Sequence, residues 1–421
     1  MSASGHRRWR GRLLLPEGVA VGALEAMGGR IVAVVPDGGG LGRGAEGGGT
    51  RGEGDAPGPP WIVPGFIDVH VHGGGGGDTM DGPDGVRALA AAHLRHGTTA
   101  LLASTLTADW PDVLAALRGV AQVVAEDAAA EDARSSDAAP TIDGAPPGGG
   151  ARAPRARVLG AHLEGPFINP GRLGAQPPFA VAPTAERVAE VLALGVVRTV
   201  TLAPELDGAL AAVARFAAAG VVVALGHTRA DADTVAAAFA AARAAADAAG
   251  VGVNVSATHL FNAMGGMSGR EPGVVGGVLG DRAAYAELIV DGHHVAPAAV
   301  RAAFNAKPDR TLLITDAIRA AGLGDGPTTL GGRPVTVTGG AARLPDGTLA
   351  GSLLTMEAAV RRAVAMGVGP EAALRAATYA PAELLGLRDR GRLQIGARAD
   401  VLVLGPELEL LEVWQAGARV A

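Results

Sequence analysis

The feature that most constrains the fold is a repeat in which a short β-rich run precedes an Ala-rich helical stretch. The runs are continuously apolar, which is typical of strands buried on both faces of a parallel sheet. Eight candidate strands are 61–70, 98–104, 157–164, 196–201, 221–227, 251–259, 287–291 and 311–316. The helical stretches that separate many of them are 84–96, 185–194, 231–249 and 296–305. This spacing predicts βα units and an α/β fold of the (β/α)8 TIM-like barrel type.

Both ends of the chain show a different pattern, in which short apolar runs are bounded by glycine. The runs that predict strands are 30–35, 391–396, 399–404 and 411–414. We expect residues 1–63 and 387–421 to form one small β-sandwich domain, from which the barrel of residues 64–386 projects.

Two segments have low complexity. Residues 36–60 are mostly Gly, Asp, Glu and Pro, a composition that cannot bury enough apolar area to become ordered. We predict a disordered loop there and a second low-complexity insertion at 126–154.

Composition argues against several classes of function. The chain has no cysteine, which excludes disulfides, thiolate metal sites and a cysteine nucleophile. Its net charge is −6 and it has no Lys/Arg tract, so we expect no nucleic-acid partner. The first apolar run ends at Pro16 and Glu17, so we expect no signal peptide, and we expect no membrane span because no apolar stretch is long enough. These features favour a cytoplasmic protein.

Histidine and carboxylate side chains gather at the ends of the predicted strands, where barrel enzymes have their active sites. His70 and His72 are two residues apart on one strand, so their imidazoles share a face. One such histidine alone could be a hydrogen-bonded core residue, but a set on several strands indicates a metal centre. The candidate ligands are His70, His72, Glu164, His227 and His259, with Asp316 beside them. This donor set suits Zn²⁺, with Fe²⁺, Mn²⁺ or Co²⁺ as alternatives.

Longer motifs around these residues carry a resemblance to a known family. The segments are 64–73 (PGFIDVHVHG), 162–167 (HLEGPF), 226–228 (GHT), 258–264 (THLFNAM), 269–273 (GREPG), 291–295 (DGHHV), 315–317 (TDA) and 349–352 (LAGS). With them the chain resembles the amidohydrolase superfamily, and within it the N-acetylglucosamine-6-phosphate deacetylases. A His-x-His pair alone would indicate only the superfamily, whereas the whole set is specific.

The resemblance implies how the metal is held. Glu164, His227 and His259 bind the principal ion. Because His70 and His72 are retained, a second ion with Glu164 as a bridge is an open alternative, so that each subunit would hold one or two ions. The single lysine, Lys307, lies far from the position of a carboxylated bridging lysine.

The expected reaction is hydrolysis of the acetamide of N-acetyl-D-glucosamine 6-phosphate to D-glucosamine 6-phosphate and acetate. A bound metal would polarise the carbonyl and lower the pKa of a water to about 7. Asp316 is the candidate general base, which takes the proton of the water and delivers it to the departing amine.

Substrate contacts are expected mainly from the resemblance. From the residues alone, Arg270 is equally a phosphate ligand or the partner of Glu271 in a surface ion pair. The resemblance favours the phosphate, with His294 as a second contact, and implies a homodimer whose neighbouring subunit completes the pocket. Further implied contacts are Ala175, Gln176, Asn262, Ala263, Asp291, Leu349, Ala350 and Gly351. Gln176 stands where many relatives have a histidine, and it cannot titrate.

Other functions remain open at this level. An N-acetylgalactosamine-6-phosphate deacetylase differs in one hydroxyl of the substrate, and an N-acyl-amino-acid deacetylase shares the chemistry. A cyclic-amide hydrolase is disfavoured by the lack of a suitable lysine. A non-catalytic barrel that binds sugar phosphates is a remote alternative, because no ligand is missing.

Overall fold

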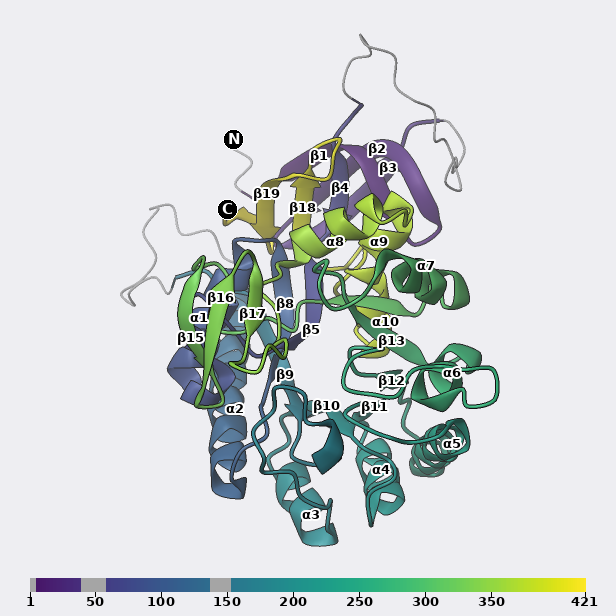
Figure 1. The fold of residues 1–421 in the computed structure, drawn as a ribbon. Coiled ribbons are helices and arrows are strands. Elements are labelled where there is room, and N and C mark those ends of the chain that lie inside the picture. The colour runs from purple at the N-terminus through teal and green to yellow at the C-terminus, as the bar shows by residue number, and fades with distance from the viewer. Residues whose placement is uncertain (1–4, 39–57, 137–152) are drawn as a thin grey trace.

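A computed structural model describes residues 5–38, 58–136 and 153–421 of the chain (Figure 1). Most of the predicted loop at 36–60 and of the predicted insertion at 126–154 lies outside the described residues.

The centre of the molecule is an eight-stranded parallel sheet. Its strands, in spatial order, are β5 (Phe66–Val71), β8 (Thr98–Ser104), β9 (Arg157–Glu164), β10 (Val197–Leu202), β11 (Val222–Leu225), β12 (Val255–Ala257), β13 (Tyr285–Ile289) and β14 (Thr311–Ile314). The two outer strands meet, because Asp316 N donates to His70 O over 2.9 Å and His72 N to Ala317 O over 3.0 Å. The sheet is therefore nearly closed into a barrel, and the predicted fold class is confirmed.

Helices surround this barrel, as Figure 1 shows. They are α1 (Pro83–Leu94), α2 (Trp110–Ser136), α3 (Ala185–Ala193), α4 (Ala209–Ala218), α5 (Ala232–Ala249), α6 (Gly273–Gly280), α7 (Pro297–Ala306), α8 (Met356–Ala365), α9 (Pro370–Ala376) and α10 (Tyr379–Leu384). Two of them start at residues that cap helices well: the side chains of Thr184 at α3 and Asp231 at α5 accept hydrogen bonds from backbone N–H groups. None of the helices among the described residues combines the length and apolar character that a membrane crossing requires.

The two terminal segments form a second sheet, in the part of the chain where a small β-sandwich domain was predicted. Its seven strands are β20 (Ala418–Arg419), β19 (Leu410–Gln415), β18 (Val401–Leu404), β4 (Trp61–Pro64), β1 (Arg7–Leu15), β2 (Gly18–Met27) and β3 (Arg30–Pro36). Strand β4 pairs with β1 on one side and with β18 on the other, so it joins the two ends of the chain.

Apart from the exact ends of single strands, three local predictions differ from the structure. The candidate strand 61–70 is two strands, because the chain passes from the terminal sheet to the barrel at Gly65, where a Cβ would lie only 2.0 Å from Thr99 Oγ1. Residues 391–396 form turns instead of a strand, since both glycines have positive φ. Residues 126–136 belong to α2, where Glu126 pairs with Arg87.

A three-stranded antiparallel sheet after β14 was not predicted from the sequence. It consists of β15 (Gly326–Leu330), β16 (Arg333–Thr338) and β17 (Ala341–Arg343). Its apolar face, with Leu330, Val335 and Val337, packs against Leu106 and Ile318 from loops that follow barrel strands. The insertion is thereby fixed beside the carboxyl ends of the strands. A two-stranded ribbon, β6 (Gly73–Gly74) with β7 (Gly77–Asp78), also leaves the barrel at this end.

Candidate metal centre and adjoining cavity

The functional side chains extend from the carboxyl ends of five barrel strands. Glu164 is the last residue of β9, and His227, His259 and Asp316 each follow two residues after β11, β12 and β14 end. These three residues have positive φ angles of 49°, 31° and 48°. Such backbone conformations are uncommon for residues other than glycine and tend to occur at functional sites.

The first potential metal-binding group is formed by Glu164, His227 and His259. Glu164 Oε1 lies 3.2 Å from His227 Nε2 and 2.9 Å from His259 Nε2. The two Nε2 atoms are 3.0 Å apart, and all three side chains are buried. The structure therefore brings together the three residues that were predicted to hold the principal ion.

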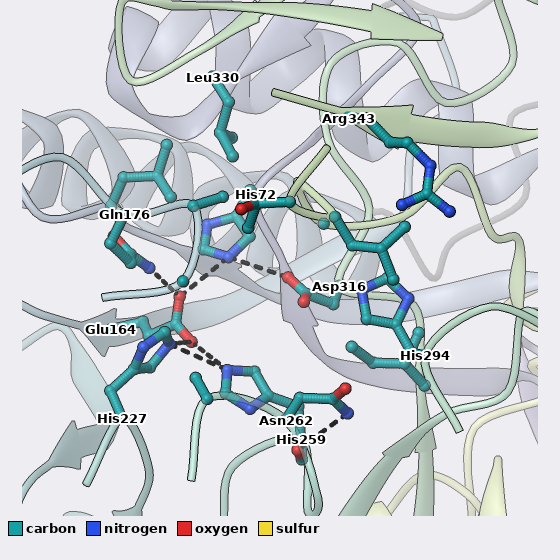
Figure 2. Close-up of a pocket in the computed structure, with 18 of the residues that line it drawn as sticks. His72, Glu164, Gln176, His227, His259, Asn262, His294, Asp316, Leu330 and Arg343 are labelled. Carbon is teal, nitrogen blue, oxygen red and sulfur yellow. Dashed lines mark hydrogen bonds and ion pairs between the residues drawn. The ribbon is translucent and has the colours of Figure 1, made fainter. Parts of the chain in front are cut away.

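A second group lies on the other side of the same carboxylate and comprises His70, His72 and Glu164. His72 Nε2 is 3.1 Å from Glu164 Oε2 and 3.1 Å from Asp316 Oδ1, as Figure 2 shows. His70 Nε2 is 3.2 Å from His72 Nε2 and 3.5 Å from Asp316 Oδ1. Glu164 Oε1 also lies 3.5 Å from His70 Nε2, whereas Oε2 faces His72, so this one carboxylate contacts both histidine groups.

The donor atoms of these groups fit a divalent metal. His227 Nδ1 donates to Arg172 O over 2.8 Å, which leaves a lone pair on Nε2 of the neutral ring. Ring nitrogens that converge on each other and on one carboxylate cannot all be satisfied by hydrogen bonds among themselves. Nitrogen and oxygen donors in this arrangement suit a metal of the Zn²⁺ type.

The electrostatics of the centre favour charged groups despite burial. Burial raises the pKa of Asp316, but His70 and His72 outweigh it and lower that pKa to about 2. Burial likewise raises the pKa of Glu164, and the surrounding histidines hold it well below its usual range. Burial lowers the pKa of His72, while Asp316 and Glu164 raise it to about 9. The carboxylates therefore stay ionised at neutral pH and provide the negative charge that a cation requires.

A cavity of about 410 Å³ opens above this centre (Figure 2). Its lining includes most of the residues predicted for the site: His72, Glu164, Ala175, Gln176, His227, His259, Asn262, Ala263, His294, Asp316, Leu349 and Gly351. Gly351 has φ +60° and packs directly on Asp316, since a Cβ there would lie 2.9 Å from Asp316 O.

Three predicted contacts do not line this cavity. Asp291 accepts a hydrogen bond from His294 Nδ1 over 2.7 Å, and Ala350 is fully buried. Arg270 lies on an exposed loop and lines a separate hollow with Arg229 and Asp231. Within its own chain, Arg270 is therefore not placed at the cavity.

Gln176 contacts the metal centre itself. Its Nε2 donates to Glu164 Oε2 over 2.5 Å, and its Oε1 accepts from Thr107 N over 2.7 Å. Arg333 of β16 donates to Ala175 O over 3.2 Å and so ties this loop to the three-stranded insertion. The amide of Gln176 thus orients the carboxylate that contacts both histidine groups.

Arg343 on β17 was not predicted as a site residue. Among the described residues that line the cavity, it is the only arginine or lysine. Its guanidinium donates to Gly347 O over 2.8 Å, and it lies near His294 in Figure 2, away from Glu164. An isolated arginine in a polar segment gives no sequence signal, because its role depends on the fold of the insertion.

Comparisons with known proteins agree with this geometry. No family model matches the chain. The N-acetylgalactosamine-6-phosphate deacetylase of Escherichia coli O157:H7 is 39% identical over 85% of this chain and 86% of its own. The human N-acetylglucosamine-6-phosphate deacetylase is 38% identical, over 85% and 84% of the two chains.

Solved structures show the same relationship. A variant of the N-acetyl-D-glucosamine-6-phosphate deacetylase of Mycobacterium smegmatis, in complex with N-acetyl-D-glucosamine-6-phosphate, has a TM-score of 0.80 and 36% identity, and the match covers 99% of this chain and 100% of that one. The N-acetylglucosamine-6-phosphate deacetylase of Thermotoga maritima has a TM-score of 0.79 and 26% identity, with 99% of each chain covered.

A nearly closed parallel barrel with histidines and carboxylates at its strand ends defines a hydrolase of the amidohydrolase type with a site that could hold a metal. Within that class, the chain belongs to the N-acetylglucosamine-6-phosphate deacetylase family, in agreement with the resemblance seen in its motifs.

Proposed function

We propose that the protein hydrolyses the acetamide of N-acetyl-D-glucosamine 6-phosphate to D-glucosamine 6-phosphate and acetate. The observation that carries the proposal is the joining of Glu164, His227 and His259 with Asp316 on the floor of one cavity. The two histidine groups would hold one or two divalent ions. We propose Zn²⁺, with Fe²⁺, Mn²⁺ and Co²⁺ as the alternatives that metal analysis would separate.

An ion held by Glu164, His227 and His259 would polarise the acetamide carbonyl and lower the pKa of a water. The carboxyl group of Asp316 is ionised, and its Oδ1 accepts a proton from the attacking water. The same oxygen then delivers the proton to the amine nitrogen, which cannot leave as an anion. No covalent intermediate is needed, since the chain lacks cysteine and no serine is found among the described residues that line the cavity.

The other side of the cavity fits the phosphate. In the substrate, the acetamide and the 6-phosphate lie on different sides of the hexose ring. In the cavity, the carboxylates of the metal centre and the Arg343–His294 pair likewise lie on different sides. A guanidinium can bind two phosphate oxygens at once. Arg343 and His294 would therefore bind the phosphate from within the chain.

We further propose a cytoplasmic homodimer. Arg270 is exposed and does not reach the cavity of its own chain, so its predicted contact with the phosphate requires a second subunit. The absence of cysteine suits a reducing compartment.

A second candidate substrate is N-acetyl-D-galactosamine 6-phosphate. The specific observation in its favour is the 39% identity with the Escherichia coli relative of that name. The two sugars differ only in the orientation of one hydroxyl, and the metal chemistry is the same for both.

An acetate-release assay tests the proposal. The purified protein is given each 6-phosphate in parallel, before and after treatment with a chelator, and its metal content is measured. We expect chelator-sensitive release with higher kcat/KM for the gluco epimer. A higher kcat/KM for the galacto epimer would make N-acetyl-D-galactosamine 6-phosphate the preferred substrate. Release of acetate that is insensitive to the chelator would contradict the proposed chemistry.

A further inference from the structure

A carboxylate that the proposed chemistry does not use contacts two residues of the metal centre. Glu287 on β13 is fully buried. Its Oε2 is 3.2 Å from His70 Nδ1 and also accepts from the backbone N of His259 over 3.3 Å. One oxygen thus contacts two candidate ligands that come from different strands of the barrel.

The second oxygen of Glu287 has no such contacts. Its Oε1 is buried without a hydrogen-bond partner, and across residues 5–38, 58–136 and 153–421 no arginine or lysine pairs with this side chain. A buried carboxylate that has no arginine or lysine partner depends on the groups beside it to offset the cost of its burial. A divalent cation at the neighbouring centre would offset that cost.

His70 differs from the other three histidines of the centre in the partner of its Nδ1 atom. His227 directs its Nδ1 to a backbone carbonyl, and the Nδ1 atoms of His72 and His259 are buried without a partner. Only the second ring nitrogen of His70 faces a carboxylate. When that Nδ1 carries the proton, the Nε2 lone pair is free to face Glu164 and His72.

We infer that Glu287 is a positioning residue of the metal centre. It holds the proton on His70 Nδ1, so that Nε2 is the ligand atom, and it fixes the backbone of His259 through the N–H bond. His259 needs such a restraint because its φ of 31° is an uncommon conformation. Carboxylates that accept from the far nitrogen of a metal-bound histidine commonly orient the ring and raise its basicity. This inference rests on the metal site of the proposed function and is independent of the substrate.

Two substitutions separate the charge of Glu287 from its contacts. Glu287→Gln keeps an acceptor oxygen in the place of Oε2 and puts the amide nitrogen where Oε1 has no partner, so it removes mainly the charge. Glu287→Ala removes the charge and both contacts. Asp400, a buried carboxylate that directly precedes β18 of the terminal sheet, provides the control in Asp400→Asn.

The measurement is Zn²⁺ affinity of metal-free protein, by competition with a chromophoric chelator, together with the tautomer of His70 from ¹⁵N NMR. We expect Glu287→Ala to weaken binding about 10- to 100-fold, and Glu287→Gln to weaken it by less while keeping the proton on Nδ1. Asp400→Asn should bind Zn²⁺ like the wild type.

Wild-type affinity in Glu287→Gln and Glu287→Ala would overturn the inference, and so would an equal loss in all three variants, which would indicate general destabilisation. If Glu287→Ala does not fold, the affinity and tautomer of Glu287→Gln still decide the question. Because the probe is the metal alone, a protein that releases no acetate would leave this result unaffected and would contradict only the proposed function.

Discussion

The two sides of the cavity are built in different ways. The metal side consists of buried residues at the ends of barrel strands, and the charges of Glu164, Asp316 and His72 determine each other's pKa. The proposed phosphate side is carried by loops and by the inserted sheet, and Arg343 there is exposed and held by one carbonyl. The rigid side suits bond breaking, whereas the loop side suits recognition of a substrate group.

The largest effect is expected from Asp316→Asn, which removes the proton acceptor from the metal side. We expect kcat to fall by about 10²- to 10⁴-fold, the usual contribution of a general base, while the bound metal is retained. Steady-state kinetics and metal analysis check both points. Turnover near that of the wild type would remove Asp316 from its role.

Arg343→Gln tests the other side of the comparison. We expect KM for N-acetylglucosamine 6-phosphate to rise by about 10- to 100-fold, the loss of a charge-assisted hydrogen bond, with little change for unphosphorylated N-acetylglucosamine. Raising the ionic strength should raise this KM more for the wild type than for the variant, because salt screens the charge of the exposed Arg343. The control is Arg361→Gln, an exposed arginine of α8 outside the cavity. Equal effects on both sugars would show that Arg343 supports the structure and does not bind the phosphate.

Arg270→Ala sharpens the comparison, because it asks whether the phosphate side is shared between subunits. We expect a rise of about 10-fold in KM for the phosphorylated sugar. Mixed dimers of Arg270→Ala and Asp316→Asn chains should be more active than the sum of the separate variants, since some sites then combine intact residues from both chains. Absence of this complementation would place Arg270 outside the site.

The smallest effect concerns pH. The raised pKa of His72, about 9, means that its ring must lose a proton before it can bind a metal at neutral pH. Metal affinity should therefore fall as the pH is lowered from about 9, by up to about tenfold per pH unit for each proton displaced. Titration calorimetry in buffers of different ionisation enthalpy measures these protons. A metal affinity that does not change with pH would contradict the proposed link between the protonation of His72 and metal binding.

Much of the metal side could be predicted from the sequence because its residues follow strand periodicity. The two-residue spacing of His70 and His72 fixes their common face, and barrel geometry places Glu164, His227 and His259 at one end. The predicted strands 221–227 and 251–259 are longer than β11 and β12, since the chain turns before each histidine.

The proposed phosphate side and the position of Glu287 could not be predicted in the same way. The position of Arg343 depends on pairing within the inserted sheet and on its packing against loops from distant parts of the chain. Glu287 lies at the start of a predicted strand, but nothing local shows that its side chain points to His70, more than two hundred residues earlier. Both placements are set by tertiary structure.

The position of β4 has a consequence for how the chain is made. A ribosome delivers β1 to β4 first, and β4 then presents an open row of backbone donors and acceptors until the segment with β18 emerges. An uncovered strand edge of this kind is a template for wrong pairing. Nascent chains that stall within the barrel should therefore be the most prone to aggregate, and chaperone binding is to be sought at that stage of synthesis.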